Sequence, residues 1–364
     1  MKARIILAGG FLGAGKTTLL RRMAEKFLEN GKTAGLITND QASGLVDTAY
    51  LKKAGSVTEE VSGSCFCCNF HGLTAAIDKM MQDDQVDVIV AEPVGSCTDL
   101  SATILQPLKE KYKDNLEISP LNVLVDPARL RAILDGETSG LHKSAAYIVR
   151  KQLEEADCIV INKIDLLTEA EVEMLKGRTA KEWPQAKVYA ISAQTGENME
   201  EWLDYVMNAT EAGTHLARVD YDVYAEGEAV LGWLNAAIMM ESKDADWKEF
   251  GEKLLHVLSS RFDGMNAAVG HVKLMIEEDG SFIVGNLTGR KDTLKIRGKS
   301  DRRNKVSLTL NARVEMTPGK LEEIVLEELK NVCGDDIRYD VQALKCLQPG
   351  RPNPTYRYDT VVNF

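Results

Sequence analysis

The stretch IILAGGFLGAGKTTLL, residues 5–20, decides the fold of this chain. A short apolar run leads into a glycine-rich turn, and a helix-forming segment follows from Lys16. Gly10, Gly15, Lys16 and Thr17 fit the pattern G-x-x-x-x-G-K-[ST], which requires a strand before it and a helix after it. The sequence therefore predicts a phosphate-binding loop and a nucleoside-triphosphate site.

The chemistry of phosphate binding explains these residue types. Glycines lack a Cβ atom, so consecutive backbone N–H groups can point at phosphate oxygens, and the helix N-terminus adds further donors. Lys16 would supply a mobile charge for the β- and γ-phosphates, and Thr17 a hydroxyl for Mg²⁺. The predicted phosphate cradle consists of Gly10, Gly13, Ala14, Gly15, Lys16, Thr17 and Thr18.

Length and composition limit the remaining possibilities. The 364 residues favour about two domains, and 44% hydrophobic with 27% charged residues is typical of a packed globular protein. A net charge of -11 argues against nucleic acid or an anionic membrane as the main partner. Apolar runs stay well below the ~18 residues of a membrane span, and the first one ends at Ala8 in the phosphate loop, unlike a signal peptide. We expect a cytoplasmic protein.

Two carboxylates follow predicted strands at the edge where α/β sheets bind ligands. Asp40 follows the run 33–38 and opens a polar loop, 39–47, where it could bind Mg²⁺, orient the attacking water or cap the next helix. Glu92 ends the buried run 86–91 and could reach the Mg²⁺ shell, while Gly95 could donate its N–H to a γ-phosphate. We predict catalytic roles for Lys16, Asp40 and Glu92, and Mg²⁺ ligation by Thr17, Asp40 and Glu92.

Three of the seven cysteines, Cys65, Cys67 and Cys68, lie within four positions of one another. Thiolates are soft ligands suited to Zn²⁺ and related ions, so the cluster favours an open metal site. The fourth ligand could be His71, a distant residue, water or a partner, and a thiol redox switch is the alternative chemistry. We interpret Cys97 as a small buried side chain, although it could extend the cluster.

A base-reading element follows the predicted strand 158–161 as Asn162-Lys163-Ile164-Asp165. A carboxylate at Asp165 can accept hydrogen bonds from both N1–H and the exocyclic amine of guanine, whereas adenine offers no matching donor pair. Ser192 and Ala193, after the run 187–191, would close over the base. These residues predict GTP as the nucleotide, bound through Gly95, Asn162, Lys163, Asp165, Ser192 and Ala193 in addition to the cradle.

The pattern of elements predicts two domains. Residues 1–210 form a phosphate-loop α/β domain with a mostly parallel sheet flanked by helices, and residues 219–364 form a smaller α+β domain. Within the second we expect strands at 221–224 and 306–314, helices at 247–261 and 321–332, and a hairpin of 271–276 with 282–284.

Five segments of residues 1–210 resemble the CobW-type GTPases, relatives of the nickel chaperone GTPases HypB and UreG. They are GGFLGAGKTTLL, the CFCC triplet, EPVG, NKID and the terminal SA, in family order. Two segments depart from the family pattern, because Ser64 precedes the triplet and Asn39-Asp40-Gln41-Ala42 replaces Asn-Glu-Phe-Gly. The later residues resemble the family's usual C-terminal domain only weakly.

The resemblance implies a GTPase metallochaperone that uses Mg²⁺ and carries Zn²⁺ or Co²⁺ on Cys65, Cys67 and Cys68. Its partner would be a client metalloprotein or a corrinoid enzyme, and it could form a nucleotide-dependent homodimer. Turnover should be slow without metal or partner, since no arginine is obviously placed as a finger. The alternative is a GTP-dependent switch or reactivator of a metalloenzyme, with structural or redox cysteines.

Overall fold

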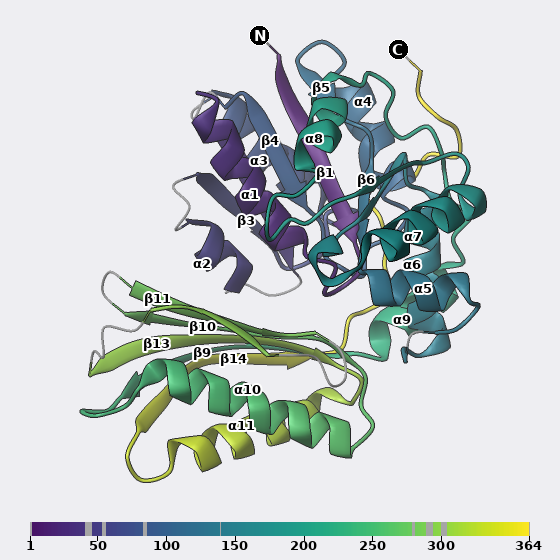
Figure 1. Ribbon diagram of the computed structural model, residues 1–364. Helices are drawn as coiled ribbons and strands as arrows, with labels where there is room; N and C mark the ends of the chain where they lie inside the picture. The colour runs from purple at the N-terminus through teal and green to yellow at the C-terminus, as the bar shows by residue number, and fades with distance from the viewer. Residues whose placement is uncertain are drawn as a thin grey trace. The chain divides into compact units, whose positions relative to one another are not determined.

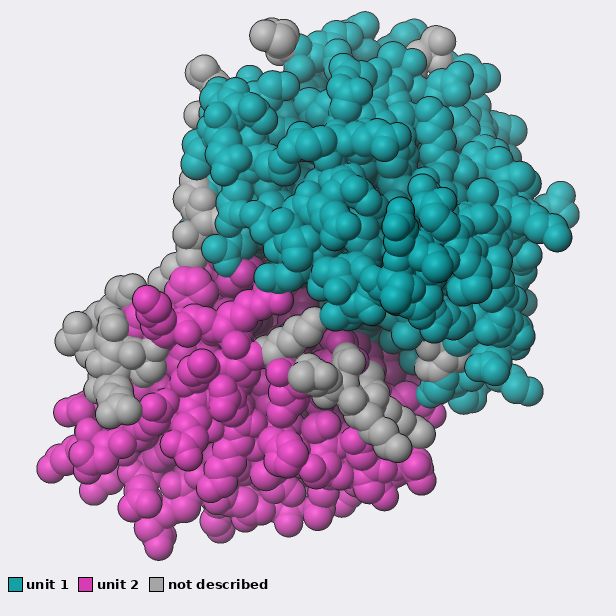
Figure 2. Space-filling view, viewed as in Figure 1, with its two compact units in different colours: residues 1–41, 51–227, 351–364 teal, residues 42–50, 228–350 magenta. Residues whose placement is uncertain are grey.

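The computed structural model describes residues 2–40, 46–52, 56–82, 86–138, 140–278, 281–288, 294–299 and 304–363. The chain forms two compact units (Figures 1 and 2). The first comprises residues 1–41, 51–227 and 351–364, and the second residues 42–50 and 228–350. Part of the polar loop expected after the second strand, 41–45, lies outside the described residues. Among the residues that are described, no helix is long and apolar enough to cross a membrane.

A parallel sheet organises the first unit, as predicted. Its strands run in the order β3-β2-β4-β1-β6-β7-β8, with β5 paired to β1, and each pairing is parallel. The central strand β1 is buried along its whole length, which fits an apolar run covered on both faces. The strands are β1 (Ala3–Gly10), β2 (Ala34–Asp40), β3 (Val57–Ser62), β4 (Val88–Glu92), β5 (Leu116–Ile118), β6 (Asn122–Val125), β7 (Cys158–Ile161) and β8 (Lys187–Ala190).

Helices flank this sheet and connect its strands (Figure 1). Local sequence explains several of their starts: Asp126 caps α5, and Thr168 with Glu171 forms a capping box at α7. A π-helical turn, Ser101–Leu105, precedes α4. The helices are α1 (Lys16–Glu29), α3 (Phe70–Gln82), α4 (Gln106–Lys111), α5 (Pro127–Leu134), α6 (Lys143–Glu154), α7 (Glu169–Glu182), α8 (Met199–Asn208) and α9 (Tyr221–Ala229).

The second unit is an antiparallel sheet with two long helices, α10 (Trp247–Gly264) and α11 (Pro318–Cys333), on one face (Figure 1). Trp247, Phe262 and Leu321 are among the apolar side chains buried between helices and sheet. The strand order is β12-β11-β10-β13-β9-β14. The strands are β9 (Gly232–Glu241), β10 (Val269–Glu278), β11 (Ser281–Leu287), β12 (Lys295–Gly298), β13 (Lys305–Val314) and β14 (Arg338–Leu347).

A segment far away in sequence joins this second unit. Helix α2 (Val46–Lys52) follows the phosphate-side strand β2, yet most of it groups with the antiparallel sheet. The backbone N–H of Val46 donates to Asn311 Oδ1 at 2.8 Å, and Lys273 forms an ion pair with Asp47 at 2.6 Å. The chain just after Asp40 is therefore held by side chains of β10 and β13.

One predicted element of the second half is wrong. Residues 221–224 form the start of α9 rather than a strand, because the Asp220 carboxylate accepts the N–H groups of Asp222 and Val223 and so opens a helix. The alternating Tyr-Asp-Val-Tyr pattern is misleading there. The hairpin, the strand 306–314 and both expected helices are present as β10, β11, β13, α10 and α11.

Candidate nucleotide and metal sites

The phosphate loop has the backbone that its glycines predict. Gly10, Gly13 and Gly15 take positive φ angles of 126°, 82° and 96°. A Cβ on Gly10 would lie 2.2 Å from the Leu124 carbonyl oxygen, so that position has room only for glycine. Gly15 also ends the loop at the start of α1, with no side chain capping the helix. The first N–H groups of α1 therefore face the loop without competition from a capping side chain.

Lys16, Thr17 and Glu92 meet at the carboxyl edge of the sheet. The Thr17 hydroxyl donates to Glu92 Oε2 at 3.1 Å, and Lys16 Nζ lies 3.8 Å from Glu92 Oε1 while donating to the Gly10 carbonyl at 2.9 Å. All three side chains are buried. A hydroxyl beside a carboxylate is a pair of hard oxygen ligands, which fits Mg²⁺.

Gly95 and Asp40 flank this group. A Cβ on Gly95 would come within 3.1 Å of both the Leu12 backbone nitrogen and Lys16 Nζ, so the Gly95 backbone runs directly beside the phosphate loop. Asp40 is buried at the end of β2, whose register pairs Thr38 with Glu92. Asp40 thus lies two residues beyond the Glu92 position on the neighbouring strand, and its catalytic role stays a prediction.

The predicted base-reading segment is tied to the phosphate loop. Asn162 Nδ2 donates to the Ala14 carbonyl at 2.9 Å, and Asn162 Oδ1 accepts the Ala193 N–H at the same distance. Asp165 Oδ1 accepts from the Ser192 hydroxyl at 2.6 Å. Asn162 therefore holds two loops together, whereas Asp165 is the member of the motif whose carboxylate is suited to reading guanine.

Asp126 is a residue of this site that the sequence reasoning did not single out. Its carboxylate accepts two N–H groups of α5 and forms an ion pair with Lys163 Nζ at 2.7 Å. Burial alone would raise the pKa of Asp126, but the charge and hydrogen bond of Lys163 lower it below its usual range. The only sequence signal was an acidic residue at a strand end before Pro127. Asp126 fixes the lysine that belongs to the base-reading motif.

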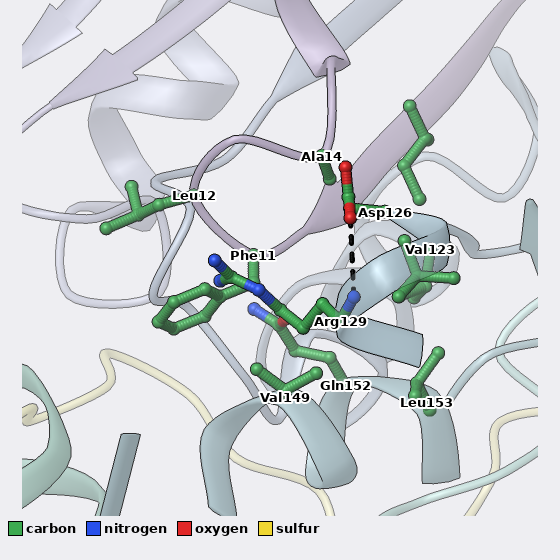
Figure 3. A pocket seen from close by; sticks show the side chains of 11 residues that line it. Phe11, Leu12, Ala14, Val123, Asp126, Arg129, Val149, Gln152 and Leu153 are labelled. Atoms are coloured by element: carbon green, nitrogen blue, oxygen red, sulfur yellow. Dashed lines mark hydrogen bonds between the residues drawn. The ribbon is translucent and has the colours of Figure 1, made fainter. Parts of the chain in front are cut away.

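A small pocket adjoins the phosphate loop (Figure 3). Phe11 and Leu12 line it from the loop, and Gln152 lines it from α6. Arg129 lies over the Phe11 ring at 4.8 Å from the ring centroid, and its backbone N–H donates to Asp126 Oδ1 at 3.3 Å. Most of the side chains that line the pocket are apolar. We therefore assign them to packing beside the predicted nucleotide-binding residues.

The three clustered thiols form one group, which we call the thiol site. Sγ of Cys65 lies 3.0 Å from Sγ of Cys67, which lies 3.8 Å from Sγ of Cys68. All three sulfur atoms are within 4.8 Å of one another. Cys65 and Cys67 are buried, and Cys68 is half-buried. Soft sulfur donors in this arrangement suit Zn²⁺, Co²⁺ or Cu⁺.

Mutual hydrogen bonds set the protonation of the thiol site. Hydrogen bonds from the Cys67, Cys68 and Cys97 thiols hold the pKa of Cys65 well below its usual range. Hydrogen bonding to Cys65 raises the pKa of Cys67, and raises that of Cys68 to about 11. These contacts favour a state in which one thiolate accepts hydrogen bonds from neighbouring thiols. A metal ion bound to all three sulfurs would therefore displace protons from the other two.

Asn39 fixes the loop that carries these thiols. Its side-chain amide donates to the carbonyls of Val61 and Ser64 at 2.8 and 2.9 Å, and its oxygen accepts the Phe66 N–H at 2.7 Å. Asn39 directly precedes Asp40 at the end of β2. The thiol loop is therefore anchored to the end of β2, the strand that carries Asp40.

Residues 351–363 return to the first unit and cross the thiol loop; we call them the C-terminal strap. The Asn353 N–H donates to Cys68 Sγ at 3.3 Å. Thr355 donates its N–H to the Cys67 carbonyl at 2.8 Å and its hydroxyl to the Cys68 carbonyl at 3.1 Å. His71, considered as a fourth ligand, instead meets the ring of Tyr356 at 6.1 Å between centroids.

Farther along the strap, a buried ion pair holds it to the first unit. Arg357 pairs with Asp99, which is fully buried, at 2.8 Å. The Tyr358 N–H donates to the Ala102 carbonyl at 3.1 Å, beside the π-helical turn. No local sequence signal marks this segment, because its partners lie more than 200 positions away.

Comparison with known proteins places the nucleotide-binding domain of the CobW/HypB/UreG model over residues 4–190. The chain is 26% identical over 208 residues to the zinc-regulated GTPase metalloprotein activator 1 of Schizosaccharomyces pombe, covering 55% of this chain and 48% of that protein. It is 26% identical over 190 residues to the zinc chaperone YjiA of Escherichia coli, covering 52% and 57%. The chain thus spans about half the length of the curated relatives it matches.

Solved structures also align with parts of this chain. The hydrogenase maturation factor HypB of Archaeoglobus fulgidus aligns at 22% identity and a TM-score of 0.40, covering 58% of this chain and 91% of that one. The Zn(II)-bound YjiA GTPase of E. coli aligns at 16% identity and a TM-score of 0.35, covering 90% and 99%.

Proposed function

The chain belongs to the CobW/HypB/UreG family, and we propose that it is a GTP-hydrolysing metallochaperone whose thiol site carries the metal. The observation that carries this proposal is the anchoring of the thiol loop. Asn39 holds that loop through three hydrogen bonds and is the residue next to Asp40. A change at the γ-phosphate edge of the sheet would therefore reach the thiols through one side chain.

The nucleotide part of the proposal rests on the phosphate loop. GTP would lie on the cradle from Gly10 to Thr18, with Lys16 near its β- and γ-phosphates and Asp165 reading the guanine edge. Thr17 and Glu92 would hold Mg²⁺, which supplies charge neutralisation on the phosphates when bound. Asp40 is the proposed residue for orienting the attacking water. Hydrolysis is expected to be slow until metal or a partner completes the site.

The metal is the cargo in this proposal, and Zn²⁺ or Co²⁺ is the expected ion. Relatives named as zinc chaperones or zinc-regulated activators support zinc. The receiving partner would be a metalloprotein or a corrinoid enzyme, and a nucleotide-dependent homodimer is part of the proposal. The seven cysteines are present as thiols rather than disulfides, and we propose the reducing cytoplasm as the location.

The test is metal affinity in two nucleotide states. Zn²⁺ is titrated anaerobically into the full chain with a non-hydrolysable GTP analogue and with GDP. We expect different affinities in the two states, and loss of both binding and the difference when Cys65, Cys67 and Cys68 are all changed to serine. Cys346→Ser, far from the thiol site in sequence, is the matched control. Equal affinities with GTP analogue and GDP in the wild type would refute the metallochaperone.

A GTP-dependent switch or reactivator of a metalloenzyme, with structural or redox cysteines, is the second candidate. The 3.0 Å separation between the sulfurs of Cys65 and Cys67 favours it, because the two thiols are close enough to approach a disulfide. Thiol counting before and after mild oxidation, with and without GTP analogue, distinguishes the two. Reversible loss of two thiols without metal binding would support the switch.

A further inference from the structure

The C-terminal strap contacts two separate loops of the first unit. Near its start, Asn353 donates its backbone N–H to Cys68 Sγ at 3.3 Å. Four residues later, Arg357 Nε donates to Asp99 Oδ2 at 2.8 Å. Asp99 lies on the loop that follows β4, seven residues after Glu92. The strap therefore bridges the thiol loop and the loop that carries the predicted γ-phosphate contact.

Asp99 is a costly position for an unpaired charge. Its side chain is fully buried, and its Oδ1 atom has no hydrogen-bond partner among the described residues. Its Oδ2 atom accepts from the Tyr221 hydroxyl as well as from Arg357. Glu155, a second fully buried carboxyl, accepts the N–H of Ser101 at 2.8 Å, two residues beyond Asp99. Because Arg357 compensates a buried acidic region, its release requires Asp99 to move as well.

The turn that leads to Asp99 can carry such a movement. Gln152 Nε2 donates to the carbonyls of Gly95 and Cys97 at 3.0 and 2.7 Å, so one side chain joins two positions of the turn. Asp99 itself has a positive φ of 65°, a left-handed conformation that residues with a side chain seldom adopt. The turn therefore ends in a strained residue, and a shift that starts at Gly95 reaches the ion pair with the strap.

We propose that the C-terminal strap is a nucleotide-controlled latch on the thiol site, and that the Arg357–Asp99 ion pair locks it. The proposal rests on the proposed metallochaperone function and names how access to its metal is regulated. A γ-phosphate bound by Gly95 draws the turn toward the phosphate loop and takes Asp99 away from Arg357. The strap then loosens over Cys68, the half-buried thiol, and the metal becomes accessible to a receiving partner. With GDP the strap stays locked.

The alternative is a strap that only packs on the first unit and does not respond to the nucleotide. Arg351 supplies a matched control on the same segment, because it pairs with Asp222 at 2.9 Å and both side chains are mostly exposed. Exposed ion pairs contribute little to stability, whereas breaking a buried one leaves an uncompensated charge. Arg357→Gln should therefore unlock the strap, and Arg351→Gln should leave it closed.

The experiment follows hydrogen exchange of the strap by mass spectrometry, on the metal-free full chain with a GTP analogue and with GDP. Opening of the strap exposes its hydrogen-bonded N–H groups. These belong to Asn353, Thr355, Tyr358 and Val362. With GDP we expect the strap of Arg357→Gln to exchange about tenfold faster than that of the wild type, and the strap of Arg351→Gln to stay within about twofold.

The wild type provides a test that does not depend on the folding of a variant. Its strap should exchange about fivefold faster or more with the GTP analogue than with GDP, whereas helix α11 of the second unit should exchange equally in both states. Arg357→Gln should lose the difference between the two nucleotides. Equal or slower exchange of the wild-type strap with the GTP analogue would overturn the latch. Equal exchange of Arg357→Gln and wild type with GDP would overturn it as well.

A zinc titration of the same samples separates the latch from the metallochaperone function. A wild type whose zinc affinity depends on the nucleotide, but whose strap exchanges equally in both states, would refute the latch and leave the metallochaperone standing. A strap that responds to the nucleotide in a chain that binds no zinc would support nucleotide control of the strap and refute the metallochaperone. A wild type that does not bind GTP would refute both.

Discussion

Loosening the C-terminal strap should speed metal release from the thiol site. Asn353 and Thr355 donate three hydrogen bonds to Cys67 and Cys68, including a backbone N–H donated to Cys68 Sγ. Cys68 is the half-buried member of the cluster, so it is the side from which a receiving ligand can reach the metal. The strap crosses that side and would have to open first.

The structure sets the size of the effect. Thr355→Pro removes both the N–H bond to the Cys67 carbonyl and the hydroxyl bond to the Cys68 carbonyl. At about 1 kcal/mol for each hydrogen bond, strap opening becomes easier by about 2 kcal/mol, or about 30-fold in release rate. Thr355→Val keeps the shape and the N–H, so about 1 kcal/mol and about fivefold are expected.

The assay mixes zinc-loaded protein with excess chromophoric chelator and follows zinc transfer with time. Tyr358→Phe is the control, because it loses only the hydroxyl contact with Glu110 and leaves the contacts to the cysteines in place. Thermal unfolding of each variant checks that the fold persists. Equal release rates in wild type, Thr355→Val and Thr355→Pro would show that the strap does not limit metal exit.

Four further outcomes follow from the sites. Asp165→Ala should weaken guanine binding by orders of magnitude; equal GTP and ATP affinities in the wild type would contradict the base assignment. Lys16→Ala and Thr17→Ala should each abolish GTP hydrolysis, measured as phosphate release. Thermal unfolding of both variants serves as the control and should match the wild type. Gly95→Ala should slow hydrolysis, because its Cβ would crowd Lys16 Nζ at 3.1 Å, and an unchanged rate would argue against a Gly95 contact with phosphate. Zinc affinity should rise between about pH 6 and 9, because the pKa of Cys68 is raised to about 11 and zinc must displace the proton of its thiol. A zinc affinity that does not change with pH in a competition titration would exclude thiolate ligation.

The parts of the fold that local patterns encode were predictable from the sequence. The phosphate loop, the buried parallel strands, the hairpin β10–β11 and the helices α10 and α11 carry their signals within a few residues. The predicted division into 1–210 and 219–364 stays a prediction about domains. The compact units differ from it because 42–50 belong to the second unit, whereas 219–227 and 351–364 belong to the first.

The features that the sequence could not give depend on contacts between distant residues. Asn353 of the strap contacts Cys68, which lies 285 positions earlier in the sequence, and Lys273 pairs with Asp47, which lies 226 positions earlier. No local period or motif marks such partners. Asp126 likewise has no motif of its own in the sequence, because its partner Lys163 follows another strand.

The thiol site has an anchor at the end of β2, the strand that carries Asp40. Asn39, next to Asp40, holds the loop that carries Cys65 and Cys67. A ligand that repositions Asn39 should change the spacing of the sulfurs, and metal affinity depends on that spacing. Because coupling free energy is reciprocal, the factor by which GTP changes metal affinity must also be the factor by which metal changes GTP affinity.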